Sequence, residues 1–289
     1  MAYKCIVLIK QVPDTSRITG EAMNEDGTVN RGALPAIFNP EDLNALELAL
    51  QIKEKYGGSV TAVTMGLPSA SEVLREALFM GADDAVLVTD RRCAASDTLA
   101  TSYILTRAAE KIGYDLVLCG RQAIDGDTAQ VGPQMAEKLD IPQITYVEQV
   151  HELSPEKIVC RRNMGNGWQK TACKLPVLLT VTDQANEPRI GAARRIMKFK
   201  NAKTPAEITK EGGSEEDISL MRDKGLLIGQ LNLDYVQADL QWCGRDGSPT
   251  KVHRIMSVVL TAKESKEVEP SAQGINDMVH ELIEDHTIG

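Results

Sequence analysis

The chain has 289 residues, which is enough for one large domain or for one domain with an appendage. Its net charge of −9 argues against a general nucleic-acid-binding protein, which would need a dominant basic face. No apolar run approaches the roughly 20 residues that span a bilayer, and the apolar stretch at the N-terminus is too short for a signal peptide. We therefore expect a cytoplasmic protein without direct membrane insertion.

The cysteine pattern indicates a reducing compartment. The six cysteines are scattered without a C-x-x-C pair, and the four histidines are equally scattered. Neither residue type has the spacing of a zinc or iron–sulfur site, so we expect no metal and predict buried free thiols. The aromatic content is only 4%, so Val, Ile, Leu, Ala and Met must form most of the core.

Apolar runs alternate with segments of helical periodicity in the first half of the chain. The predicted strands are Lys4–Ile9, Ser59–Met65, Ala85–Val88, Leu116–Cys119 and Ile144–Val147. The predicted helices run from Pro40 to Gly57, from Ser69 or Ser71 to Gly81, from Ser96 to Gly113 and from about Thr128 to Leu139. This alternation predicts βαβ crossovers, and therefore an α/β fold with a parallel sheet covered by helices on both faces.

The pattern changes after the first half. Lys157–Arg162 and Trp168–Cys173 flank an Asn-Gly turn signal, which predicts an antiparallel hairpin, and Leu175–Thr182 is a further strand. The Gly- and acid-rich residues 211–217 are interpreted as a linker, and Gln273–Glu284 as a final helix. We therefore predict an α/β domain over residues 1–210 and a linker with a C-terminal arm over residues 211–289.

The loop that follows Cys119 is the most informative segment. It joins a strand to a helix at the carboxyl end of the predicted sheet, where doubly wound proteins bind ligands. Free N–H groups at the helix start can hold a phosphate, and Gly126 and Gly132 allow a close approach of the backbone. The alternative is an ordinary loop whose aspartates only cap the helix. Neither the dinucleotide fingerprint nor the Walker loop is present.

Two further loops are expected at the same edge of the sheet. They contain Asn39-Pro40-Glu41-Asp42 and Met65-Gly66-Leu67-Pro68. Each has a plain alternative as a helix cap, which is the commoner role of Asn and Ser at such positions. Three loops that converge at one edge favour a nucleotide site, because each adds backbone donors to one crevice.

A basic segment, Arg189–Lys203, lies after the predicted strand Leu175–Thr182. It contains no acidic residue and six basic residues, which are Arg189, Arg194, Arg195, Lys198, Lys200 and Lys203. One interpretation is a solvated basic turn, and the other is a surface that docks an acidic partner.

Several of these motifs together resemble the electron-transfer flavoprotein β family. Ala123-Ile124-Asp125, Asp127, Gln130 and Gly132 are similar to the nucleotide-binding loop of that family. Asn186-Glu187-Pro188-Arg189, followed by Ile196-Met197-Lys198, resembles its partner-recognition segment. Leu175-Pro176, Asn39-Pro40 and Gly81-Ala82-Asp83 also match, in order and spacing, so the resemblance covers roughly Lys4 to Lys203.

The resemblance implies a flavodoxin-like fold related to the adenine-nucleotide α-hydrolases. It also implies a heterodimer with an α subunit that carries its own FAD. We expect the C-terminal arm beyond about Gly229 to pack on that subunit and not on the sheet of this chain. The implied nucleotide contacts are Leu8, Asn39, Pro40, Asp42, Met65, Gly66, Ala123, Ile124, Asp125, Gly126, Asp127, Thr128, Ala129, Gln130, Val131, Gly132, Pro133 and Gln134. The implied partner-recognition segment is residues 186–203, with Arg189, Ala193, Arg194, Arg195, Lys198 and Lys200 as docking residues.

The loop departs from the AMP-holding form of the family at three positions. Gly126, Ala129 and Val131 stand where that form has Asp, Asn and Thr. The loop is instead similar to the bifurcating branch, in which the β site holds FAD that is reduced by NADH. Ala193 stands where mitochondrial members carry Leu, which argues against docking to a mitochondrial-type acyl-CoA dehydrogenase.

We therefore expect an electron-carrier subunit that binds FAD and passes electrons from NADH to the α-subunit flavin and to a partner, either an acyl-CoA dehydrogenase-type enzyme or another flavin dehydrogenase. No side chain is expected to act as a catalyst, because the flavin does the redox chemistry. One alternative is the same subunit with a structural AMP. Another is a nucleotide-sensing stress-type protein, against which the basic segment and the C-terminal extension argue.

Overall fold

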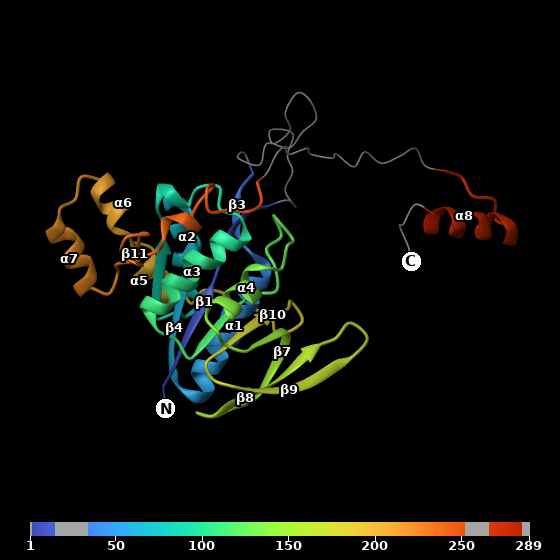
Figure 1. Ribbon diagram of the computed structural model, residues 1–289, viewed down its shortest axis with the longest axis horizontal. Helices are drawn as coiled ribbons and strands as arrows, with labels where there is room; N and C mark the ends of the chain where they lie inside the picture. Colours follow the sequence, from blue (N-terminus) through green and yellow to red (C-terminus); the bar gives the residue numbers. More distant parts are fainter. Residues whose placement is uncertain (1, 15–33, 252–265, 285–289) are drawn as a thin grey trace, which may run out of the picture.

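The computed structural model describes residues 2–14, 34–251 and 266–284. In these residues a nine-stranded sheet lies between two layers of helices, with a two-stranded sheet beside it (Figure 1). The strands of the large sheet are β1 (Tyr3–Leu8), β4 (Gly58–Met65), β5 (Asp84–Val88), β6 (Leu116–Gly120), β7 (Gln143–Leu153), β8 (Lys157–Asn163), β9 (Trp168–Lys174), β10 (Val177–Val181) and β11 (Gly229–Leu231). The small sheet pairs β2 (Gln11–Pro13) with β3 (Ala36–Phe38).

The strand order is β11-β5-β4-β1-β6-β10-β7-β8-β9. Strands β11 to β7 are parallel. β8 and β9 form the predicted antiparallel hairpin, and β7 also pairs with β8 in antiparallel orientation, which was not predicted. The chain moves outward from β1 to β4 and β5 and then returns to the other side of β1 as β6. The predicted α/β class is confirmed. Within it, β1 lies between the second and fourth parallel strands, which is the Rossmann-type order and differs from the flavodoxin order. Because the strand order changes direction at β1, a topological switch point lies between β1 and β6.

Alternating side chains of the sheet contact different helices. Cys5 and Val7 point towards α1 (Pro40–Tyr56) and α2 (Ser71–Met80) in one apolar cluster. Ile6 and Leu8 belong to a second cluster with α3 (Thr98–Ile112) and α4 (Val131–Lys138). Consecutive apolar residues are buried in β1 because both faces of a parallel sheet are covered.

Helix α4 begins later than the sequence predicts, at Val131 and not near Thr128. The reason is the backbone of the preceding loop, because Asp127 and Ala129 have φ values of 48° and 53°. Left-handed residues cannot continue a right-handed helix, so the helix starts only after them.

Only part of the predicted linker over residues 211–217 lies outside a helix. A turn over residues 211–214 joins α6 (Pro205–Lys210) to α7 (Glu215–Asp223), so the last three residues of the predicted linker are helical. The hydroxyl of Ser214 accepts the N–H of Asp217, and the carboxylate of Asp217 accepts the N–H of Ser214, which is a capping box that starts α7. The basic segment is likewise not a plain turn, because it contains α5 (Ala193–Phe199).

The expectation that the chain beyond Gly229 leaves its own sheet is wrong for the first part of that region. β11 pairs with β5, and Leu233 and Val236 are fully buried in the cluster beneath α3. The final helix is confirmed as α8 (Ala272–Glu284), which has no buried residue and stands apart from the sheet in Figure 1. Its docking on an α subunit stays a prediction.

All six cysteines are free, and four of them are buried, which are Cys5, Cys119, Cys160 and Cys243. Burial raises the pKa of the Cys160 thiol to about 12, as expected for an unreactive core cysteine. Among the described residues, no helix is long and apolar enough to cross a membrane.

Candidate functional site

A cavity of about 700 Å³ lies at the switch point, where β1, β4 and β6 end. Its volume falls within the ~300–1,000 Å³ of typical ligand sites. Among the predicted contacts, those that line the cavity are Leu8, Asp42, Met65, Ala123, Asp125, Gly126, Asp127, Thr128, Ala129, Gln130, Val131 and Gly132. Those outside the lining are Asn39, Pro40, Gly66, Ile124, Pro133 and Gln134. The predicted convergence of three loops at this edge is therefore confirmed, while the binding role of each residue stays a prediction.

Asn39 is fully buried and braces the loop from behind. Its Nδ2 donates to the carbonyl of Gln122 at 2.9 Å, and its Oδ1 accepts the N–H of Ile124 at 3.1 Å. Asn39 occupies the expected N-cap position of α1, but its side chain makes no capping bond to that helix. Asn39 acts on the cavity by fixing the shape of the loop.

Asp42 ties together the ends of the two strands that flank the switch point. Its carboxylate accepts the N–H of Lys10, after β1, at 2.9 Å and the N–H of Gly120, at the end of β6, at 2.9 Å. A Cβ at Gly120 would lie 2.6 Å from this carboxylate, so only glycine fits there. Burial raises the pKa of Asp42 to about 7, although both N–H groups favour the charged form.

The loop before α4 offers a run of free backbone donors. Within the described part of the chain, the N–H groups of residues 128–132 donate to no acceptor. Ala129 is left-handed and Gln130 is right-handed, with φ values of 53° and −99°. In other proteins such an alternation turns successive N–H groups to one side, and here it lies directly before a helix start, where the backbone also favours anions.

The two glycines of the loop have different roles. A Cβ at Gly126 would meet no atom within 4 Å, so this position leaves open space beside the cavity. A Cβ at Gly132 would lie 2.8 Å from the sulfur of Cys119 and 3.1 Å from the Cγ2 of Thr180. Gly132 therefore lets α4 pack closely on β6 and β10, in addition to lining the cavity.

Two cations lie at the rim, and sequence reasoning assigned neither of them. Lys10 pairs with Asp125 at 2.7 Å, and Arg121 pairs with Glu41 at 2.7 Å while its guanidinium lies 5.8 Å from the ring centre of Tyr146. Arg121 is the first residue after β6 and Lys10 is the second residue after β1, so both could have been assigned to this edge from their positions at the ends of parallel strands. These charges reduce the repulsion between an anionic ligand and the nearby carboxylates.

Sequence reasoning also missed a wall of the cavity, formed by residues 96–98 and by Thr250. Thr250 donates to Asp97 through its hydroxyl at 2.6 Å and through its N–H at 3.0 Å. Burial would raise the pKa of Asp97, but these bonds and the N–H of Ala100 outweigh it and lower that pKa. The start of α3 could have been assigned to the cavity from its position at this edge of the sheet, whereas no local sequence pattern marks Thr250.

The predicted docking residues divide into two groups. Arg189 pairs with Glu47 on α1, and Arg195 donates to the carbonyl of Leu78 at 2.6 Å, so both side chains face the domain. Ala193, Arg194, Lys198 and Lys200 are exposed on or beside α5. Whether the exposed group docks a partner stays a prediction.

Comparisons with known proteins identify the family. Residues 26–210, more than half of the chain, match the electron transfer flavoprotein domain. The electron transfer flavoprotein subunit beta of Thermoanaerobacterium thermosaccharolyticum is 44% identical over 247 residues, covering 86% of this chain and 85% of the relative. The caffeyl-CoA reductase-Etf complex subunit CarD of Acetobacterium woodii is 41% identical over 256 residues, covering 88% and 87%. The acryloyl-CoA reductase electron transfer subunit gamma of Anaerotignum propionicum is 38% identical over 293 residues, covering 98% of each chain. The chain therefore belongs to the electron transfer flavoprotein family, as a β-type subunit in electron transfer.

Proposed function

We propose that this chain forms a heterodimer with an α subunit that carries its own FAD, and that the cavity at the switch point holds a second FAD. The observation that carries this proposal is the combination of an open space at Gly126 with the free N–H groups of residues 128–132 on one cavity of about 700 Å³. Membership of the electron transfer flavoprotein family argues against the alternative of a nucleotide-sensing stress-type protein.

The residues of the cavity fit FAD by size and by donor type. FAD consists of AMP joined to a second phosphate, a ribityl chain and an isoalloxazine ring. The N–H groups of residues 128–132 would hold the two phosphates, which need several donors in one concavity. Leu8, Met65 and Leu105 give the cavity apolar surface for the rings. Gly126 removes a side chain where the longer ligand passes.

The protein's own part in the reaction is to bind, orient and shield. Bound FAD would supply the redox chemistry, namely acceptance of a hydride from NADH with formation of NAD⁺ and single-electron transfer to the α-subunit flavin and to a partner. Asn39 and Asp42 would fix the loop and the strand ends against which the cofactor lies. No side chain is assigned a proton transfer. The names of two relatives, caffeyl-CoA and acryloyl-CoA reductase subunits, support a flavin dehydrogenase of CoA esters as the partner.

A structural AMP is the competing ligand, and nucleotide analysis separates the two. The experiment is to purify the heterodimer, denature it and quantify the released FAD and AMP. Two FAD per heterodimer support the proposal, whereas one FAD with one AMP refutes it.

Gly126→Asp tests the account of the loop. An added charge at this exposed position would repel each phosphate by about 1 kcal/mol at ~4 Å in water, and so by about 2 kcal/mol for two phosphates, or about 30-fold in affinity. We expect selective loss of the β-site FAD and of NADH-driven reduction. The matched control is Gly167→Asp on the hairpin, where a Cβ also meets no atom within 4 Å. Retention of both flavins in Gly126→Asp would show that the loop does not contact the phosphates.

A further inference from the structure

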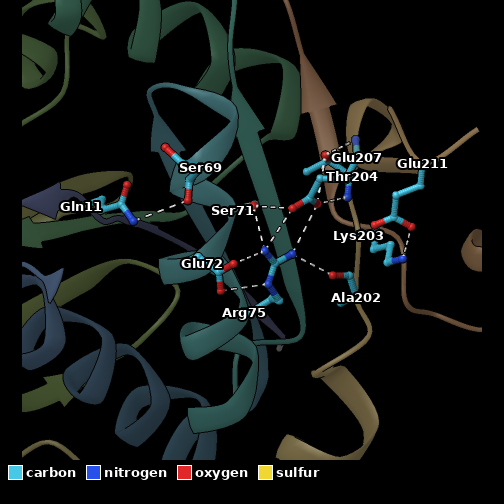
Figure 2. A network of polar contacts seen from close by, with 10 residues as sticks. All are labelled: Gln11, Ser69, Ser71, Glu72, Arg75, Ala202, Lys203, Thr204, Glu207 and Glu211. Atoms are coloured by element: carbon cyan, nitrogen blue, oxygen red, sulfur yellow. Dashed lines mark hydrogen bonds and ion pairs between the residues drawn. The ribbon is translucent and has the colours of Figure 1, made fainter. Parts of the chain in front are cut away.

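Arg75 lies at the centre of a polar network that joins α2 to α6 and to Ala202, which lies between α5 and α6 (Figure 2). Its guanidinium donates to both carboxylate oxygens of Glu207, at 3.0 and 3.3 Å, and to the carbonyl of Ala202 at 2.9 Å. It also donates to the hydroxyl of Ser71 at 3.0 Å and to Glu72 at 2.7 Å. Only 11% of the Arg75 side chain is exposed, so these bonds are shielded more than those of a surface ion pair.

Glu207 serves two structures at once. Besides its bonds to Arg75, its carboxylate accepts the N–H of Thr204 at 2.7 Å and the hydroxyl of Ser71 at 2.8 Å. The bond to Thr204 is half of the capping box that starts α6. Burial would raise the pKa of Glu207, but the bonds from Arg75, Thr204 and Ser71 lower it to about 2. The pair therefore stays charged at neutral pH.

The network fixes one side of the segment that carries α5. At its other side, Arg195 donates to the carbonyls of Leu78 and Ala82 at the end of α2, and the N–H of Ala192 donates to the carbonyl of Phe79 at 3.1 Å. Helix α5 is only seven residues long, too short to hold its position by itself. Its orientation on α2 therefore depends on these anchors at its two ends.

The anchors leave a defined outer surface. Arg194, Lys198 and Lys200 are exposed there, and Met197 and Ile190 are 65% and 90% exposed. Inward-facing arginines fix the segment, while outward-facing cations and apolar side chains remain free to contact another protein. Such a surface complements an acidic rim around an apolar patch.

We propose that Arg75 and Glu207 are positioning residues for electron transfer to the partner. They hold the α5 surface in its docking orientation and do not themselves contact the partner. This inference rests on the proposed docking function of residues 186–203. Pre-organisation of this kind lowers the ordering cost of association, so losing it weakens binding without changing the charge of the docking surface.

The test uses the intact heterodimer and a purified bacterial acyl-CoA dehydrogenase as the electron-accepting probe. Arg75→Met keeps the length and apolar stem of the side chain but removes the donors, and Arg75→Lys restores the charge with fewer bonds. Arg107→Met on α3 is the matched control, because Arg107 pairs with Glu110 three residues after it, much as Arg75 pairs with Glu72 three residues before it. For Arg75→Met we expect KM for the dehydrogenase to rise about tenfold at little changed kcat, with partial recovery in Arg75→Lys.

Two further readouts distinguish positioning from general stability. Amide exchange of residues 192–202 should accelerate in Arg75→Met, while flavin content and NADH-driven reduction of the heterodimer stay as in the parent. Because Arg75 and Glu207 contact each other, the effects of Arg75→Met and Glu207→Gln on KM should be less than additive in the double variant. Unchanged KM in Arg75→Met, or an equal loss of NADH-driven reduction, overturns the proposal.

The outcome is separable from failure of the proposed function. Charge reversal at Arg194 and Lys198 tests the docking surface directly. If it slows electron transfer while Arg75→Met does not, only the positioning role is refuted. If it has no effect either, docking through residues 186–203 is refuted, and the positioning role is refuted with it.

Discussion

Replacing Asp42 by Asn should change how the stability of this protein depends on pH. The pKa of Asp42 is raised to about 7 in the folded protein, against about 3.9 for an unfolded aspartate. The folded state therefore binds the proton more tightly, and its stability advantage is fully present below the unfolded pKa. That advantage is lost as the pH rises through the folded pKa.

The size of the effect follows from the same two values. Proton linkage with these two pKa values lowers the unfolding free energy of the wild type by about 2–3 kcal/mol as the pH rises from about 5 to about 8. Asn keeps the shape of a protonated carboxyl group but does not ionise. One of the two N–H donors, from Lys10 or Gly120, loses its best acceptor in the variant, which costs about 1–3 kcal/mol at every pH. Because this cost does not depend on pH, it lowers the unfolding free energy of the variant equally at every pH and leaves its pH dependence unchanged.

The assay is denaturant unfolding of both proteins across this pH range. We expect the difference in unfolding free energy between Asp42→Asn and the wild type to move in favour of the variant by about 2–3 kcal/mol as the pH rises. Titration of all other groups cancels in this difference. Parallel curves for the two proteins would refute the reasoning, because they would show that Asp42 is ionised throughout and that its two N–H donors outweigh its burial.

Three other predictions follow from the geometry. Gly132→Ala should lower the unfolding free energy by about 1–3 kcal/mol, because the added methyl group overpacks α4 against Cys119. Gly126→Ala should leave the unfolding midpoint unchanged, and equal midpoints for the two variants would contradict the packing account. Charge reversal at Arg194 and Lys198 should slow electron transfer to a partner in stopped-flow kinetics, most at low ionic strength. Arg195→Glu should instead lower the melting temperature, because it breaks bonds to α2. Deletion from Pro270 onward should weaken heterodimer formation in analytical ultracentrifugation and leave the α/β domain folded, since α8 buries no residue in this chain; unchanged association would refute its docking role.

The sequence by itself determined the elements and the edge at which the site forms. The apolar runs that became β1, β4 and β6, and the helical periodicity between them, are local properties that require a parallel sheet with helical crossovers. Because the carboxyl ends of parallel strands meet at one edge, the loops at Asp42, Met65 and Gly126 had to converge there, whatever the order of the strands. The capping box at Ser214 is equally local, but the two glycines before it favour a linker, which hides the start of α7.

Only the tertiary structure decided which distant segments complete the site. The pairing of β11 with β5 and the bond from Thr250 to Asp97 join residues more than a hundred positions apart, and no local pattern specifies such a pair. The same holds for Asn39, whose sequence context indicates a helix cap while its side chain bonds to Gln122 and Ile124. A short polar side chain takes whichever partners the packing of the whole domain brings within reach, because a buried polar group must be satisfied.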